Sequence, residues 1–182
     1  PLSIASKKVT RFSLAIVIDD VGYSLGELQP FLDCPEQLNF AVLPHLPNSR
    51  EAVEAIRAAG KEAILHMPME PLGNANPGPG AIYSYHSDEE IYTLLDKAVA
   101  SLVEVPGLNN HMGSKATADR RIMSVVASFI LDKGMFFLDS KTTAESTGRR
   151  AAADRGIPFL ERAVFLDNEP TYDKITEQIK GG

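Results

Sequence analysis

The chain has 182 residues, 44% of them hydrophobic and 23% charged, which fits one globular domain with a substantial core. A formal net charge of −6 without a dense run of lysine and arginine excludes typical nucleic-acid binding. The single cysteine, Cys34, excludes an intramolecular disulfide and a metal site built from thiolates, and no apolar run approaches the length of a membrane span.

Strands and helices alternate when apolar periodicity and turn signals are followed from the N-terminus. Such alternation predicts an α/β fold of parallel strands with helices on the outside. The predicted strands are 12–19, 37–44, 61–67, 107–113, 135–140 and 158–168. The predicted helices are 48–60, 87–105, 117–134, 142–156 and 172–179, and a loop rich in proline and glycine covers 70–86.

All six predicted strands end in polar or ionisable residues. In parallel α/β folds, functional sites form at the carboxyl ends of the strands, where the loops converge. These residues therefore predict a polar centre at one end of the sheet. They are, strand by strand, Asp19 and Asp20; His45; His66, with Glu70 four residues on; Asn109, Asn110 and His111; Asp139, Ser140 and Lys141; and Asp167 and Asn168.

The adjacent carboxylates Asp19 and Asp20 repel each other at the end of an apolar strand, and a divalent cation would offset that repulsion. We expect Asp20, His66 and His111 to bind the cation, leaving positions for water and substrate. Carboxylate oxygen with imidazole nitrogen favours zinc, with iron, cobalt, nickel and manganese as alternatives. Neighbouring residues of a strand point to opposite faces, so both aspartates reach one centre only if the chain bends there, and Gly22 permits such a turn.

Structural roles are open for several of these residues. A lone histidine at a strand end is more often a hydrogen-bonded structural residue, and His45 and His86 suit loop positions better than ligand positions. Asp139 and Asp167 are also suited to capping a helix. The remaining alternatives are an ion pair of Lys141 with Asp139 or Glu145, a chain turn at Asn109 and Asn110, and a rim or lid formed by the loop 70–86.

The chain resembles the divergent polysaccharide deacetylases, a distant branch of the chitin and peptidoglycan deacetylase superfamily. Six ordered motifs carry the resemblance: AIVIDDVGYS, FAVLPHLPNS, ILHMPMEP, GLNNHMGSKAT, FFLDSKTT and RAVFLDN. They run from about Phe12 to about Asn168. The resemblance implies a distorted, incomplete (β/α) barrel, with a single deacetylase-like domain across residues 1–182. It also implies that Asp19 is the catalytic base and Asp20 a metal ligand.

The chain departs from the superfamily's pattern at two places. The usual metal motif has two histidines four residues apart, whereas that spacing here joins His66 to Glu70, so either Glu70 or His111 would replace the second histidine. Usual members also carry a histidine near the last strand as general acid. This sequence offers Asp167, which would need burial to stay protonated near neutral pH. The residues expected to contact substrate or support the ligands are Glu70, Asn110, Asp139, Ser140 and Lys141.

The resemblance implies an extracytoplasmic, metal-dependent hydrolase, most readily a zinc enzyme, that removes acetyl groups from an N-acetylated polysaccharide or envelope glycan. The alternative is a non-catalytic carbohydrate-binding or envelope-organising domain that keeps the metal site. A phospho-receiver domain is a third hypothesis, since it shares the acidic pair, Met67 followed by Pro68, and Lys141. However, His66 stands where a receiver needs its phosphoacceptor aspartate.

Overall fold

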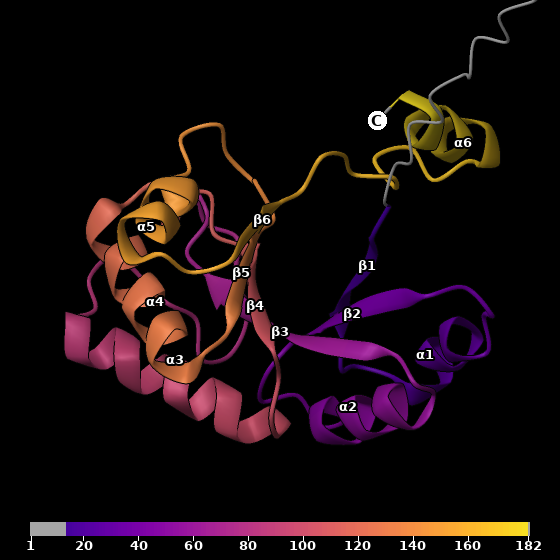
Figure 1. The fold of residues 1–182 in the computed structure, drawn as a ribbon, viewed down its shortest axis with the longest axis horizontal. Helices are drawn as coiled ribbons and strands as arrows, with labels where there is room; N and C mark the ends of the chain where they lie inside the picture. The colour runs from indigo at the N-terminus through magenta and orange to yellow at the C-terminus, as the bar shows by residue number, and fades with distance from the viewer. Residues whose placement is uncertain (1–13, 182) are drawn as a thin grey trace, which may run out of the picture.

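The computed structural model describes residues 14–181 and contains one sheet of six parallel strands in the order β1-β2-β3-β4-β5-β6. The sheet curves strongly, and helices surround its outer side (Figure 1). The predicted distorted, incomplete (β/α) barrel is therefore confirmed. The strands are β1 (Ile16–Val21), β2 (Leu38–Val42), β3 (Glu62–Met69), β4 (Gly107–Met112), β5 (Phe136–Asp139) and β6 (Phe159–Glu161). The helices are α1 (Leu25–Leu32), α2 (Ser49–Ala58), α3 (Asp88–Leu102), α4 (Arg120–Lys133), α5 (Gly148–Arg155) and α6 (Tyr172–Gly181).

Aliphatic side chains make most of the core, which lies between the sheet and the helices. Every residue of β3 after Glu62 is buried, as expected for a central parallel strand covered on both faces. The predicted apolar stripe of α3 is confirmed, because Ile91, Leu95 and Leu102 are fully buried. His66 is therefore the polar exception among the buried residues of β3.

Capping side chains set the helix ends around this core. The predicted capping box of α3 is present: the Ser87 hydroxyl accepts a hydrogen bond from the Glu90 amide (3.3 Å), and the Glu90 carboxylate accepts one from the Ser87 amide (2.7 Å). Asp119 caps α4 by accepting hydrogen bonds from the amides of Arg121 and Ile122. These caps fix where α3 and α4 begin.

One helix, α1, is missing from the sequence prediction. Pro30 lies inside it and removes an intrahelical donor, so the segment carries a breaker signal instead of a helix signal. The helix forms because the Ser24 side chain caps its first turn and Leu28 is buried in the core.

Two further elements are shorter than predicted because of contacts with other parts of the chain. The predicted helix 142–156 begins only at Gly148, since the amide of Thr147 donates to the carbonyl of Thr117 (2.8 Å) and the Ser146 hydroxyl binds Asp139. The predicted strand 158–168 ends at Glu161, because its partner β5 ends at Asp139, opposite Glu161 in the register.

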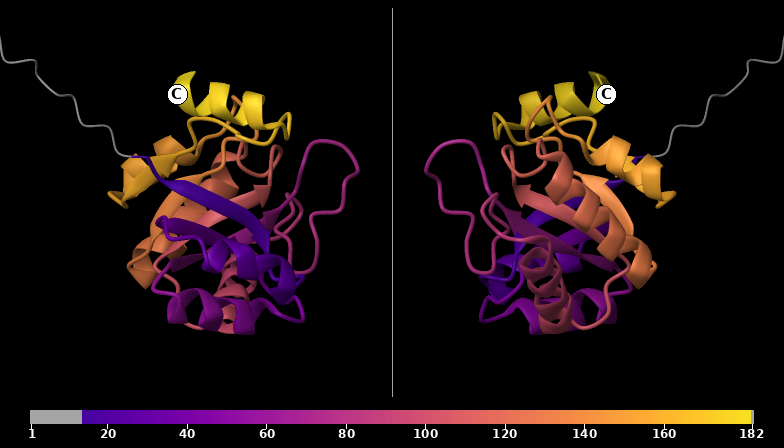
Figure 2. Two further views of the ribbon diagram at one scale, coloured as in Figure 1. Left: turned by 90° about the vertical axis from the view of Figure 1, so that its right-hand side faces the viewer. Right: turned by 90° about the vertical axis from the view of Figure 1, so that its left-hand side faces the viewer.

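The loop 70–86 is confirmed as an irregular connection, and Figure 2 shows it standing out beside the sheet. A single bridge between Met69 and Ile82 fixes its base, and Ile82 is fully buried. None of the helices within residues 14–181 is long and apolar enough to cross a membrane. The start of the first predicted strand, residues 12–13, lies outside the described range.

Candidate metal centre

The end of β1 is irregular, and the irregularity directs two carboxylates toward one place. The register between β1 and β2 shifts between Ile18 and Val21, and Asp20 has a left-handed backbone conformation with φ of 60°. This conformation is uncommon outside glycine, although aspartate adopts it more readily than most residues. The predicted bend is confirmed, and it occurs at Asp20, two residues before the expected turn at Gly22, whose φ is 130°.

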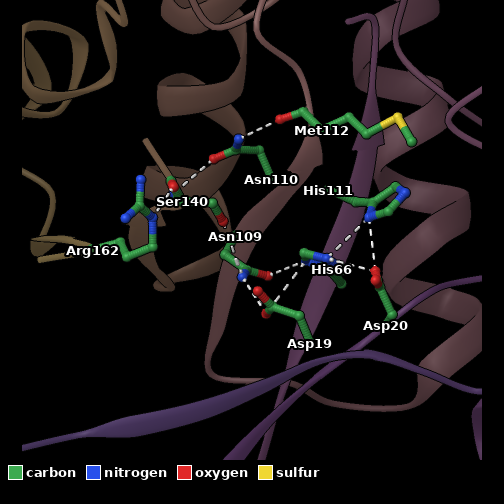
Figure 3. A network of polar contacts seen from close by, with 9 residues as sticks. All are labelled: Asp19, Asp20, His66, Asn109, Asn110, His111, Met112, Ser140 and Arg162. Atoms are coloured by element: carbon green, nitrogen blue, oxygen red, sulfur yellow. Dashed lines mark hydrogen bonds and ion pairs between the residues drawn. The ribbon is translucent and has the colours of Figure 1, made fainter. Parts of the chain in front are cut away.

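Strand pairing brings two histidines to the same place. His66 of β3 lies opposite Asn109 of β4 in the parallel register, and His111 is two residues beyond Asn109. Residues opposite each other in the register project to the same face of the sheet, so Asn109 lies on the side of His66. Side chains alternate along a strand, so His111, two residues after Asn109, lies on that side as well. Figure 3 shows these side chains converging with the two aspartates of β1.

Three donor atoms form a compact cluster, which we call the Asp20–His66–His111 cluster. Asp20 Oδ1 lies 2.8 Å from His111 Nδ1 and 3.2 Å from His66 Nε2. The two ring nitrogens are 3.2 Å apart. His66 is buried and His111 is half-buried, whereas Asp20 is more than half exposed. The cluster therefore has a buried base and one side open to solvent.

The cluster fits a divalent cation by geometry and by donor type. Within residues 14–181 it is the one group of three or more His, Cys, Asp or Glu side chains close enough to share an ion. Metal bonds of about 2.1 Å in tetrahedral or octahedral geometry separate neighbouring ligand atoms by roughly 3.0–3.4 Å, close to the distances here. Two imidazoles and one carboxylate match zinc and the later first-row metals.

Asn109 fixes the tautomer of His66. Its Nδ2 donates hydrogen bonds to Asp19 Oδ1 (3.1 Å) and Ser140 Oγ (3.2 Å), so its Oδ1 is the atom 2.7 Å from His66 Nδ1. Since a carbonyl oxygen only accepts, His66 Nδ1 carries the proton and Nε2 presents a lone pair to the cluster. A hydrogen bond of this kind, from the ring nitrogen that does not bind the metal, fixes the orientation of a metal-binding histidine.

The electrostatics of the cluster favour the Asp20 anion. Hydrogen bonding to His111 is the largest cause that lowers the pKa of the Asp20 carboxyl well below its usual range, although burial opposes it. A hydrogen bond from His66 lowers this pKa further only in the form of the ring that carries a proton on Nε2. With His66 Nε2 unprotonated and Asp20 ionised, two electron-pair donors face each other across 3.2 Å. A proton or a cation between them relieves this repulsion.

Asp19 lies beside the cluster but not in it. Its Oδ1 is 3.9 Å from His66 Nδ1, the nitrogen on the opposite side of the ring from the atom that faces Asp20. The side chain is 35% exposed and accepts the hydrogen bond from Asn109 Nδ2. The neighbouring aspartates therefore occupy different environments.

Three predicted supporting residues lie behind the cluster. The buried carboxylate of Asp139 accepts hydrogen bonds from the Lys141 amide (2.8 Å) and the Ser146 hydroxyl (2.5 Å). The amide of Ser140 donates to Asn110 Oδ1 (2.9 Å). The hydrogen bond between Ser140 and Asn110 thus joins the ends of β4 and β5, whereas Asp139 holds the segment that leads from β5 to α5.

Two other predicted residues lie elsewhere. The Lys141 ammonium pairs with Glu161 (3.0 Å) and not with the partners considered from sequence. Asp167 is exposed in the segment after β6, and no hydrogen bond joins it to the cluster within the described residues. Asp167 therefore lacks the burial that a general acid at this position would need.

Glu70 anchors the loop 70–86 instead of joining the cluster. Its carboxylate accepts hydrogen bonds from the Lys115 ammonium (2.8 Å) and the Ser84 amide (2.7 Å). Burial raises the pKa of Glu70, but the hydrogen bonds from Lys115 and Ser84 outweigh it and lower the pKa below 4.5. Of the two alternatives left open by the sequence, the geometry places His111 beside Asp20 and His66.

Replacing Glu70 by glutamine is expected to lower the free energy of unfolding by about 1 kcal/mol at pH 7. Since folding lowers the pKa of Glu70, its contribution is complete above the unfolded value of 4.5 and is lost as the pH falls through the lower folded value. Urea unfolding of wild type and E70Q should therefore converge at acid pH. As a control, D96N removes an exposed ion pair with Lys133 and should cost little.

Two residues of the polar network have roles that the sequence prediction missed. The sequence prediction places Asn109 in the polar centre or in a chain turn but gives it no role in orienting His66, although its position two residues before a candidate ligand is a usable signal. Nothing in the sequence indicates a role for Arg162. Its guanidinium donates to the carbonyls of Ser140 (2.6 Å) and Lys141 (2.8 Å), and these contacts exist only in the folded chain.

Relatives of known sequence share most of this chain. It is 33% identical over 167 residues to an uncharacterized protein of Haemophilus influenzae, with 92% of this chain and 60% of that protein aligned. It is 35% identical over 173 residues to the uncharacterized protein YibQ of Escherichia coli, with 95% of this chain and 54% of that protein aligned. The chain thus spans little more than half the length of these relatives.

The fold and the family agree with these relationships. The crystal structure of the uncharacterized protein ATU2773 from Agrobacterium tumefaciens superimposes with a TM-score of 0.87 at 25% identity, covering 92% of this chain and 69% of that one. A family model described as divergent polysaccharide deacetylase matches residues 16–182. The chain therefore belongs to the divergent polysaccharide deacetylase family.

Proposed function

We propose that this protein is a metal-dependent hydrolase that removes acetyl groups from an N-acetylated glycan. The observation that carries the proposal is the Asp20–His66–His111 cluster, in which three donor atoms from three strands lie 2.8–3.2 Å apart and a fourth side chain, Asp19, lies beside them. Family membership supports the choice of an acetylated glycan as substrate.

Asp20, His66 and His111 would hold the cation, with zinc as the proposed metal. A cation bound there supplies polarisation of the acetyl carbonyl and a lowered pKa for bound water. Asn109 keeps the lone pair of His66 Nε2 directed at the site by accepting the proton of Nδ1. The open side of the cluster, where Asp20 is exposed, leaves room for the substrate.

Asp19 would act as the general base. It is ionisable, partly exposed and outside the donor set, so it is able to take a proton from the attacking water. The water oxygen bonds to the acyl carbon, the carbon–nitrogen bond breaks, and acetate and a free amine result. The amine needs one proton, and protonated Asp19 holds the proton that the water gave up.

We also propose that the domain works outside the cytoplasm, on a glycan of the cell envelope, and the description of its family model as a polysaccharide deacetylase supports this proposal. Fractionation of the full-length protein in its host tests the location. Its confinement to the cytosol would contradict the proposal.

The activity test combines metal binding with acetate release. Protein stripped by a chelator is titrated with zinc and incubated with N-acetylated chito-oligosaccharides and muropeptides, and free acetate is measured. We expect one zinc per chain and acetate release that stops when the chelator is restored. One tightly bound zinc without acetate from any substrate would favour the non-catalytic carbohydrate-binding alternative.

A further inference from the structure

Arg162 clamps the chain immediately after β5. Its Nε donates to the Ser140 carbonyl (2.6 Å) and its Nη2 donates to the Lys141 carbonyl (2.8 Å), so one guanidinium holds two successive carbonyls. Lys141 is left-handed, with φ of 49°, a conformation that is costly for a side chain of this kind. The face of the guanidinium lies 3.5 Å from the ring centroid of Phe165. The two charge-assisted hydrogen bonds offset the strain at Lys141.

The clamped segment supports the backbone on both sides of His111. The Ser140 amide donates to Asn110 Oδ1 (2.9 Å), and Asn110 Nδ2 donates to the Met112 carbonyl (2.7 Å). The Thr142 hydroxyl donates to that same carbonyl (2.9 Å). Both neighbours of His111 in the sequence are thus tied to the segment 140–142, and Figure 3 shows most of this chain of contacts.

The same segment reaches His66 through one side chain. The Ser140 hydroxyl accepts from Asn109 Nδ2 (3.2 Å), which orients the amide so that Asn109 Oδ1 faces His66 Nδ1. A rotated or mobile Ser140 would remove one of the two acceptors that determine this orientation. Ser140 thus shares with Asp19 the orientation of Asn109, and through Asn109 it acts on the tautomer of His66.

We propose that Arg162 is a positioning residue for the candidate metal centre: by clamping Ser140 and Lys141 it holds the supports of both histidines in place. The proposal rests on the proposed function, since it gives Arg162 a task in preparing the Asp20–His66–His111 cluster for a cation. Arg162 itself does not contact the cluster in any hydrogen bond of the described residues.

The first test compares R162M with R149M. Arg149 is a matched control, because its guanidinium also lies over a phenylalanine, Phe159, and pairs with Glu161 of β6. It shares Glu161 with the Lys141 ammonium, but within the described residues it donates no hydrogen bond to the backbone of Ser140 or Lys141. Zinc affinity, measured by competition with a chelating dye, is expected to fall about 10-fold in R162M and to change little in R149M. R162Q, which keeps one donor group, replaces R162M if that variant does not fold.

The second readout needs no metal. Nitrogen NMR of metal-free protein labelled in histidine, recorded near pH 8 where ordinary imidazoles are neutral, reports which nitrogen of His66 carries the proton. We expect protonated Nδ1 in wild type and R149M, and a mixture of tautomers in R162M. Because it uses metal-free protein, this readout remains decisive if wild type binds no zinc, a result that would defeat the proposed function alone.

A double-mutant cycle with S140A tests whether Arg162 acts on the cluster through Ser140. Ser140→Ala removes only the hydroxyl that accepts from Asn109, so R162M is expected to cost clearly less zinc affinity in the S140A background than in wild type. Fully additive losses would show that Arg162 does not act through Ser140. A His66 tautomer in R162M identical to that in R149M, with unchanged zinc affinity, would overturn the proposal.

Discussion

Zinc affinity is expected to fall by more than about 100-fold when either His66 or His111 is replaced by alanine. Loss of a residue that merely supports a metal ligand commonly costs 10–100-fold, so loss of a ligand is expected to cost at least that much. Each histidine presents one ring nitrogen to the cluster, within 3.2 Å of Asp20 Oδ1. The measurement is competition titration with a chelating dye, supported by metal analysis of the dialysed protein.

The two variants should differ in stability. His66 is 3% exposed, and its removal leaves Asn109 Oδ1 without its ring donor, so H66A is expected to lose about 1–3 kcal/mol of unfolding free energy. His111 is 19% exposed, so H111A is expected to lose less unfolding free energy than H66A. H86A is the control, because the His86 ring accepts a hydrogen bond from the Tyr83 amide and lies outside the cluster. Full zinc occupancy at wild-type affinity in H66A and H111A would disprove the ligand assignment.

Most of the fold followed from local patterns, because every element except α1 carries its own periodicity or turn signals. The strand 12–19 contains the continuous apolar run 14–18, and a helix such as α3 shows both its apolar stripe and its cap in the sequence. The parts that failed depend on distant partners. Gly148 starts α5 late because Ser146 and Thr147 bond to Asp139 and Thr117, contacts that no local pattern encodes.

The candidate site divides in the same way. Residue type and position at a strand end were enough to select Asp20, His66 and His111, because parallel strands all end at one edge of the sheet. The hydrogen bonds that hold these three residues in place could not be predicted from the sequence. Asn109 bonds to a carboxylate 90 residues away in the chain, and Arg162 bonds to a carbonyl 22 residues away.

The choice between Glu70 and His111 shows why spacing alone was insufficient. Four residues from His66, Glu70 has already passed the end of β3 and turned toward Lys115. His111 is 45 residues from His66 in the chain, yet their ring nitrogens are 3.2 Å apart because β3 and β4 pair. The register between β3 and β4, which the local sequence does not encode, therefore determines that His111 and not Glu70 lies beside His66.

The two adjacent aspartates are expected to respond differently to the same substitution. D20N should lower zinc affinity by roughly 10–100-fold or more, since it replaces an anionic donor that lies 2.8 Å from His111 Nδ1 with a neutral amide. D19N should leave zinc affinity within about 3-fold of wild type, because Asp19 faces the Nδ1 side of His66, away from the donor atoms. Its acetate release should fall roughly 10²–10⁴-fold, the usual cost of removing a general base.

The division of roles depends on measuring both quantities on both variants. Zinc titration is paired with acetate release from the best substrate, each at saturating zinc so that weak binding does not imitate slow chemistry. D19N keeps the size of the side chain and an oxygen able to accept from Asn109 Nδ2, so the orientation of Asn109 and His66 is preserved. If D19N and D20N lose zinc equally, Asp19 belongs to the metal site. If D19N binds zinc and still releases acetate at the wild-type rate, Asp19 is not the base, and the proton from water goes to another group.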